Sequence, residues 1–184
     1  HFPGMNRFVI LELFLGKFRD RMRRLRGFSR DWDPCEMAVS IDDRGGDRKG
    51  KSFLSQDHYF EALHECDFVL SPPGICTPLS HNLIEAMFCG AIPITNAGVF
   101  MARPLEGGSN CLEFFKPADF PEAIEKALSM TYNKIWELRL GAFDYYWHFL
   151  KPLSFGNLLK TYDGKHLFVN GEEKSVPFVH PQFI

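Results

Sequence analysis

The chain has 184 residues, of which 45% are hydrophobic, 15% aromatic and 24% charged, with a formal net charge of -2. These fractions are typical of a globular protein and exclude a disordered tail, a collagen-like chain and a coiled coil. A net charge near zero argues against nucleic acid as the main partner, because proteins that neutralise phosphates usually carry a clear basic excess.

The charge is unevenly distributed along the chain. Residues 1–30 hold eight basic and two acidic side chains, a net charge of +6, whereas the other 154 residues hold 13 basic and 21 acidic, a net charge of -8. This asymmetry predicts an anionic ligand or surface near residues 17–30. The five cysteines are an odd number without CxxC spacing, and no Asn-x-Ser/Thr site occurs. Both absences favour the cytoplasm or the cytoplasmic face of a membrane. Because the chain begins with His, we expect a processed or excised piece.

The first half of the chain predicts short alternating elements. Residues 7–15 form a β-branched apolar run that predicts a strand ended by Gly16. Residues 17–26 predict an amphipathic helix with arginines on one face, and residues 36–41 predict a second strand. A glycine-rich charged loop follows at 42–51, and residues 52–65 predict another amphipathic helix.

The second half continues the alternation. Residues 67–71 predict a strand, and Thr77-Pro78 predicts the N-cap and first turn of a helix that ends near Gly90. Residues 91–95 predict a strand in which Pro93 lies at the strand start or at a bulge, because proline cannot donate to a β-ladder. A strand at 111–115, a helix at 121–130 and an aromatic helix at 131–150 follow.

This alternation predicts an α/β fold, with a Rossmann-like parallel sheet covered by helices on both faces. We assign residues 1–150 to one nucleotide-sugar-binding domain and 151–184, rich in proline and glycine, to a C-terminal wrapping tail. The aromatic residues of 135–149 are expected in the core rather than on a sugar-binding surface.

Residues 67–96 carry the most specific chemical pattern. A strand, a turn at Gly74 and a helix start would place backbone N–H donors at the crevice beyond a parallel sheet, where phosphates bind. His81, Asn82 and Glu85 share one helix face, and we expect Glu85 two turns into that helix. A carboxylate there suits the hydroxyls of a ribose, because it only accepts hydrogen bonds. The alternative is a solvated helix carboxylate.

Glu85-Ala86-Met87 with Gly90 and Pro93 resembles the C-terminal half of GT-B-fold glycosyltransferases. The wider pattern is similar to the exostosin-like group, in which a proline and glycine turn precedes the glutamate. Here the turn is Pro73-Gly74, and Ser80 lies five residues before Glu85. Three further segments also resemble that group, namely residues 7–17 near the start of the chain and the later segments 110–114 and 119–124.

The resemblance implies that Glu85 holds the ribose of a nucleotide sugar, while Gly74, Ser80, His81 and Asn82 approach its diphosphate. Two positions depart from the pattern. A second glutamate, present in many retaining members, is replaced by Thr77, and a basic residue is replaced by Asn82. Lys17, Arg19 or the 44–51 cluster is therefore expected to meet the diphosphate charge.

The predicted function is that of the donor-binding half of a glycosyltransferase, which transfers a sugar from a nucleotide diphosphate sugar to a glycan or other acceptor hydroxyl. The resemblance implies no metal and no further cofactor, and it leaves the catalytic residues unassigned. An N-terminal acceptor half would lie on a missing segment or on a partner chain. Close likeness to the exostosin group would place the protein in the Golgi or ER lumen.

Two other functions remain open at the sequence level. One is a non-catalytic module that binds a nucleotide or a sugar phosphate on the same fold. The other is a domain that uses the arginine-rich helix at 17–26 to lie on an anionic membrane surface. Metal binding by the carboxylates of 42–47 is the weaker interpretation of that loop, because lysine and arginine are interspersed with them.

Overall fold

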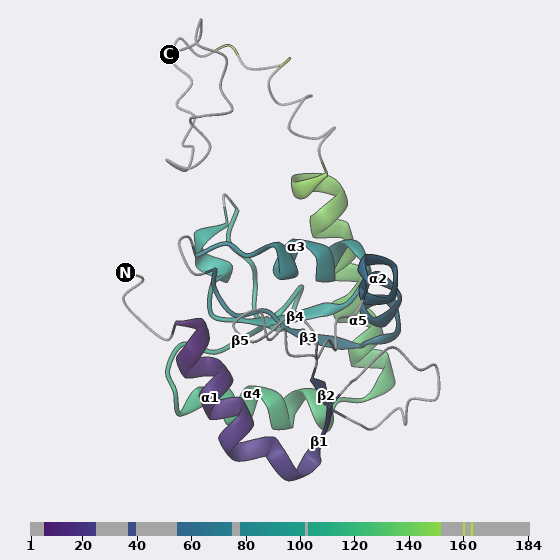
Figure 1. The fold of residues 1–184 in the computed structure, drawn as a ribbon. Coiled ribbons are helices and arrows are strands. Elements are labelled where there is room, and N and C mark those ends of the chain that lie inside the picture. The colour runs from purple at the N-terminus through teal and green to yellow at the C-terminus, as the bar shows by residue number, and fades with distance from the viewer. Residues whose placement is uncertain are drawn as a thin grey trace, which may run out of the picture.

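The computed structural model describes residues 6–24, 37–39, 55–74, 78–101 and 103–151, together with 160 and 163. Helices and strands alternate through these ranges (Figure 1). The helices are α1 (Arg7–Phe18), α2 (Gln56–Glu65), α3 (His81–Phe88), α4 (Asp119–Leu128) and α5 (Tyr132–Tyr145), which a π-helical turn extends over Tyr146–Leu150. The strands are β1 (Met22–Arg24), β2 (Met37–Val39), β3 (Phe68–Leu70), β4 (Ile92–Thr95) and β5 (Leu112–Glu113).

The central layer is a parallel sheet in the order β3-β4-β5. Figure 1 shows α2 and α3 on one side of this sheet and α1 and α4 on the other. β1 and β2 pair in a separate parallel sheet of two strands, which confirms part of the strand predicted at 36–41. The fold is therefore of the α/β class, as the alternation predicted, with a small parallel sheet.

All four residues of β4 are buried, as expected for a central parallel strand. Pro93 is the second residue of β4, and the strand tolerates it because the residues on either side of it direct their hydrogen bonds toward β3. The Ile92 N–H donates to the Asp67 carbonyl, and the Ile94 carbonyl accepts from Ser71 N–H, so both residues face β3. The Pro93 nitrogen faces the other way, and pairing with β5 begins only at Ile94. The proline therefore costs the sheet no ladder bond.

The N-terminal predictions were wrong. Residues 7–15 form helix α1 rather than a strand, and no continuous helix covers 17–26, because α1 ends at Phe18 and a short 3-10 turn leads into β1. The Asn6 side chain accepts hydrogen bonds from the N–H groups of Phe8 and Val9 and so caps α1. Ile10, Phe14 and Phe18 recur every four residues and are buried on one face.

Helix α3 begins later than predicted. Its first residue is His81 and its N-cap is Ser80, so the N-cap predicted at 77 is wrong, and Thr77 itself lies outside the described residues. Pro78 instead lies before the helix, and its carbonyl accepts a hydrogen bond from the Gly74 N–H at 3.3 Å. The end of the helix was predicted correctly: Gly90 has a φ of +76°, a conformation that glycine adopts without strain.

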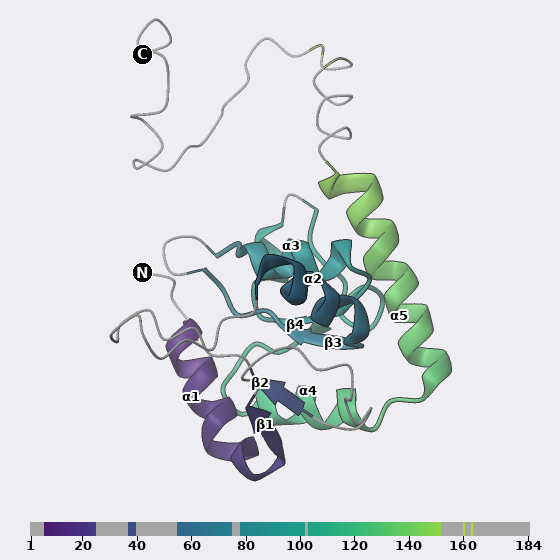
Figure 2. The ribbon, with the colours of Figure 1, turned by 45° about the vertical axis from the view of Figure 1, so that its right-hand side comes forward.

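Two hydrophobic clusters lie on the two sides of the sheet. One joins α1 and α4 to β4 and β5, and the other joins α3 to α5 through residues such as Leu83, Met87 and Ala142. Figure 2 shows α5 along one side of the molecule, from the level of α4 to beyond α3.

The outer face of α5 corrects another prediction. The helix buries Leu138, Ala142 and Tyr145 on its inner face, so the prediction holds for the aromatic Tyr145. Four other aromatics predicted in the core are exposed, namely Trp136 at 53%, Phe143 at 41%, Trp147 at 39% and Phe149 at 45%.

Arg139 of α5 binds the edge at which the strands begin. Its Nε donates to the Gly90 carbonyl, and its Nη2 donates to the carbonyls of His64 and Cys66. Its Nη1 pairs with the Asp67 carboxylate at 2.8 Å. One guanidinium therefore satisfies carbonyls at the C-terminal ends of α2 and α3.

Candidate functional site

The carboxyl edge of the sheet is where the helices before β3 and β4 begin. α2 ends at Glu65, three residues before β3, and α3 ends at Phe88, four residues before β4. Each helix therefore runs back along the sheet, which places its first turn toward the carboxyl ends of the strands. In open parallel sheets this edge is where ligands bind.

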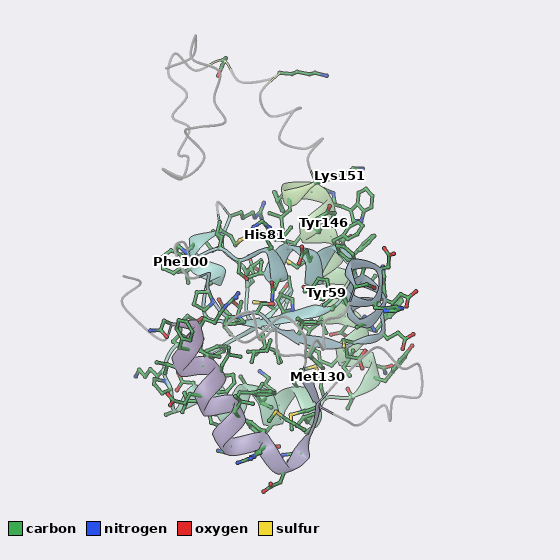
Figure 3. The ribbon with its side chains drawn as sticks, viewed as in Figure 1. Tyr59, His81, Phe100, Met130, Tyr146 and Lys151 are labelled. Atoms are coloured by element: carbon green, nitrogen blue, oxygen red, sulfur yellow. The ribbon has the colours of Figure 1, made fainter. Side chains whose placement is uncertain are left out.

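Glu85 lies at this edge, one helical turn after the start of α3 rather than the two turns predicted. The Tyr59 hydroxyl, from the first turn of α2, donates a hydrogen bond to Glu85 Oε2 at 3.0 Å. Figure 3 shows Tyr59 on α2 and His81 at the beginning of α3. Among the described residues, Glu85 Oε1 receives no hydrogen bond, so one oxygen of this carboxylate is available as an acceptor.

The surroundings of Tyr59 keep its hydroxyl protonated. Burial raises the pKa of Tyr59 above its usual range, and the hydrogen bond to Glu85 and the charge of that carboxylate raise it further. The charge of the Arg7 guanidinium, at the start of α1, acts in the opposite direction and lowers the pKa of Tyr59 by the smallest of these effects. Tyr59 and Glu85 thus form a joined donor and acceptor, and Arg7 is a cation whose charge acts on Tyr59; we call these three residues the edge cluster.

Arg7 Nε and Ser80 Oγ are buried polar atoms with no hydrogen-bond partner within the described ranges. Ser80 is the N-cap of α3 and is only 7% exposed, yet its hydroxyl does not cap the helix. Buried polar groups are nearly always hydrogen-bonded, so each such exception needs an explanation. A ligand with anionic oxygens at the start of α3 would supply an acceptor for the Ser80 hydroxyl.

The other predicted site residues are more dispersed. His81 is exposed and Asn82 half-buried in the first turn of α3, while the Gly74 N–H already donates within its turn. Lys17 and Arg19 are exposed at the far end of α1. Ten residues of helix separate Lys17 from Arg7, about 15 Å at 1.5 Å per residue. The structure thus brings Ser80 and Glu85 to the same edge but does not bring Lys17 or Arg19 there. The 44–51 cluster lies outside the described residues.

A surface hollow of about 430 Å³ lies along α1 and is lined by Val9, Glu12, Leu13, Gly16 and Lys17, none of which belongs to the edge cluster. Its lining is mainly aliphatic, with one carboxylate and one ammonium group. The edge cluster has the convergent polar groups that a phosphorylated ligand requires, so we place the candidate site there.

Sequence reasoning missed Arg7, Tyr59 and Glu113. Arg7 was assigned to a strand, and Tyr59 was treated as part of an apolar helix face, although a tyrosine on a buried face needs a partner for its hydroxyl. Glu113 ends β5, and its carboxylate accepts the Gly107 N–H at 3.1 Å. Burial raises the pKa of Glu113, and the Gly107 hydrogen bond opposes that rise. No local motif marks Glu113, because its surroundings come from the separate loop at 98–107.

Within the described ranges, no group of three or more His, Cys, Asp or Glu side chains is arranged to hold a metal ion. Over the same part of the chain, none of the helices combines the length and apolar character that a membrane span requires.

Comparisons with known proteins add no relative. The chain matches no protein-family model, and neither the curated proteins nor the solved structures include a significant match.

Proposed function

We propose that this chain is the donor-binding half of a glycosyltransferase, which binds a nucleotide diphosphate sugar for transfer of the sugar to an acceptor hydroxyl. The observation that carries the proposal is the Glu85 carboxylate at the carboxyl edge of a parallel sheet, where Oε2 accepts from Tyr59 and Oε1 receives no hydrogen bond from the residues that the structure describes. The resemblance of residues 67–96 to the donor half of GT-B enzymes supports the same assignment.

Each group of the site has a role in this proposal. Glu85 Oε1 accepts a hydrogen bond from a ribose hydroxyl. Ser80, the first N–H groups of α3 and the Arg7 guanidinium meet the diphosphate, whose charge grows as the sugar leaves. Preorganised donors of this kind stabilise a leaving group without moving during the reaction. The acceptor, and a base to activate it, come from another segment or a partner chain, such as an N-terminal half.

Calorimetric titration with UDP, GDP, CMP and ADP tests this proposal. We expect one of these nucleotides to bind, and Glu85→Ala to weaken its binding at least tenfold, because a hydrogen bond to a charged group contributes roughly 1.5–3 kcal/mol. Glu137→Ala is the matched control, since Glu137 is an exposed helical glutamate paired with Lys134 on α5. Failure of all four nucleotides to bind would contradict the proposal, as would equal binding by the Glu85 and Glu137 variants.

The second candidate is a non-catalytic module that binds the same ligand. It is favoured by Thr77, which replaces the second acidic residue of retaining enzymes. Slow release of free sugar from a bound nucleotide sugar would support the enzyme, and binding without any release would support the module. The membrane-surface alternative assumed one helix over 17–26, whereas in the described part of that segment α1 ends at Phe18 and a 3-10 turn and β1 follow.

A further inference from the structure

Tyr59 sits in a rigid setting between two helices. Its ring lies 5.6 Å from the ring of Phe60, which in turn meets Phe88 of α3 edge-on at 6.3 Å. Phe88 contacts Tyr146 beyond α5 at 5.3 Å. This row of aromatic rings fixes α2 against α3, so the Tyr59 hydroxyl is held at a set place relative to the backbone of Glu85.

A glutamate one turn into a helix is otherwise free to rotate about three side-chain bonds. Ordering such a side chain when a ligand binds costs conformational entropy, which weakens binding. The hydrogen bond from Tyr59 to Oε2 removes much of that freedom before any ligand arrives. It also occupies one of the two oxygens, so that the remaining oxygen, Oε1, has a defined position.

We infer that Tyr59 is a positioning residue that orients the Glu85 carboxylate and thereby sets the preference of the site for ligands with ribose hydroxyls. This inference rests on the proposed function of Glu85. It goes beyond it by assigning ribose discrimination to a residue on a different helix, 26 positions earlier in the chain. Tyr59 acts only as a donor here, because its buried hydroxyl stays protonated beside the carboxylate.

The test compares two ligands in two proteins. UDP and 2′,3′-dideoxy-UDP, or the corresponding pair for whichever base binds, are titrated into the wild type and into Tyr59→Phe. We expect the wild type to prefer the ribose form, and Tyr59→Phe to reduce that preference about fivefold, within the range for loss of one hydrogen bond. Affinity for the dideoxy form should stay unchanged, because that ligand has no hydroxyl for Glu85.

Two further variants make the result specific. Tyr132→Phe removes a hydroxyl from a tyrosine that is 76% exposed on α5, and it should leave the preference intact. Replacing Tyr59 with 4-aminophenylalanine keeps the ring and an N–H donor, and it should restore the preference. If Tyr59→Phe does not fold, the 4-aminophenylalanine variant is used for the test instead. Loss of the ribose preference in that variant, once it is shown to be folded, overturns the inference.

The outcomes separate the inference from the proposed function. If the wild type binds no nucleotide, both fail. If the wild type binds with a ribose preference that Tyr59→Phe leaves unchanged, only the inference fails. Equal weakening of both ligands in Tyr59→Phe would mean that Tyr59 merely supports the fold, and that result also overturns it.

Discussion

Glu113 occupies a niche made by two glycines at the end of β5. A Cβ atom added to Gly98 would lie 3.0 Å from Glu113 Oε1, and one added to Gly107 would lie 2.8 Å from Oε2. The carboxylate is therefore enclosed by backbone, with the Gly107 N–H as its hydrogen-bond donor. This enclosure accounts for the raised pKa, because burial disfavours the charged form.

The niche predicts a pH dependence of stability. An acid whose pKa is higher in the folded state than in the unfolded state loses stabilising effect as the pH rises from the unfolded pKa through the folded pKa. With an ordinary value of 4.5, that loss begins above about pH 4. Urea unfolding should therefore show that Glu113→Gln removes a decline in stability that the wild type shows as the pH rises above about 4. Glu137→Gln, at an exposed glutamate, is the control. Identical pH profiles of stability for the wild type and Glu113→Gln would contradict the prediction.

At the scale of elements, a glycine of α5 lets that helix approach the loop before β5 closely. A Cβ added at Gly141 would lie 2.1 Å from the Ser109 carbonyl oxygen, which is backbone and cannot move aside alone. Gly16, in α1, has nothing within 4 Å of such an atom. The two glycines therefore form a matched pair within helices.

Alanine substitution should have opposite effects at these two positions. Gly141→Ala should destabilise the protein by about 2 kcal/mol, because overpacking displaces the helix or the loop. Gly16→Ala should stabilise it by about 0.5–1 kcal/mol, because alanine favours a helix over glycine. Chemical denaturation measures both, and a neutral Gly141→Ala would show that α5 does not approach the loop so closely.

Sequence patterns predicted some elements well and others badly, for physical reasons. β3, β4 and α4 were predicted within a few residues, since Gly90, Pro93 and the 3.6-residue period of α4 act locally. α1 was missed because the β-branched run at 8–11 favours a strand locally. The segment forms a helix because Ile10, Phe14 and Phe18 are then buried together on one face. This burial depends on packing against α4, which is distant in the sequence. Of the site, Glu85 and Ser80 were predicted from their motif, but Tyr59 and Arg7 belong to other elements that only the fold brings near.

At the scale of the whole molecule, the two edges of the sheet have different roles. Arg139 occupies the edge where strands begin and binds carbonyls from α2 and α3 together. The edge where strands end carries the edge cluster and the buried Ser80 hydroxyl. This division fits a scaffold that is fixed on one side and binds its ligand on the other.

The most direct test of the account is a crystal structure of the chain with the nucleotide that binds it best. We predict a ribose hydroxyl within hydrogen-bond distance of Glu85 Oε1, the Tyr59 hydroxyl still on Oε2, and the diphosphate at the start of α3 near Ser80 and Arg7. A nucleotide seated in the hollow along α1, or one that leaves Glu85 untouched, would contradict the account.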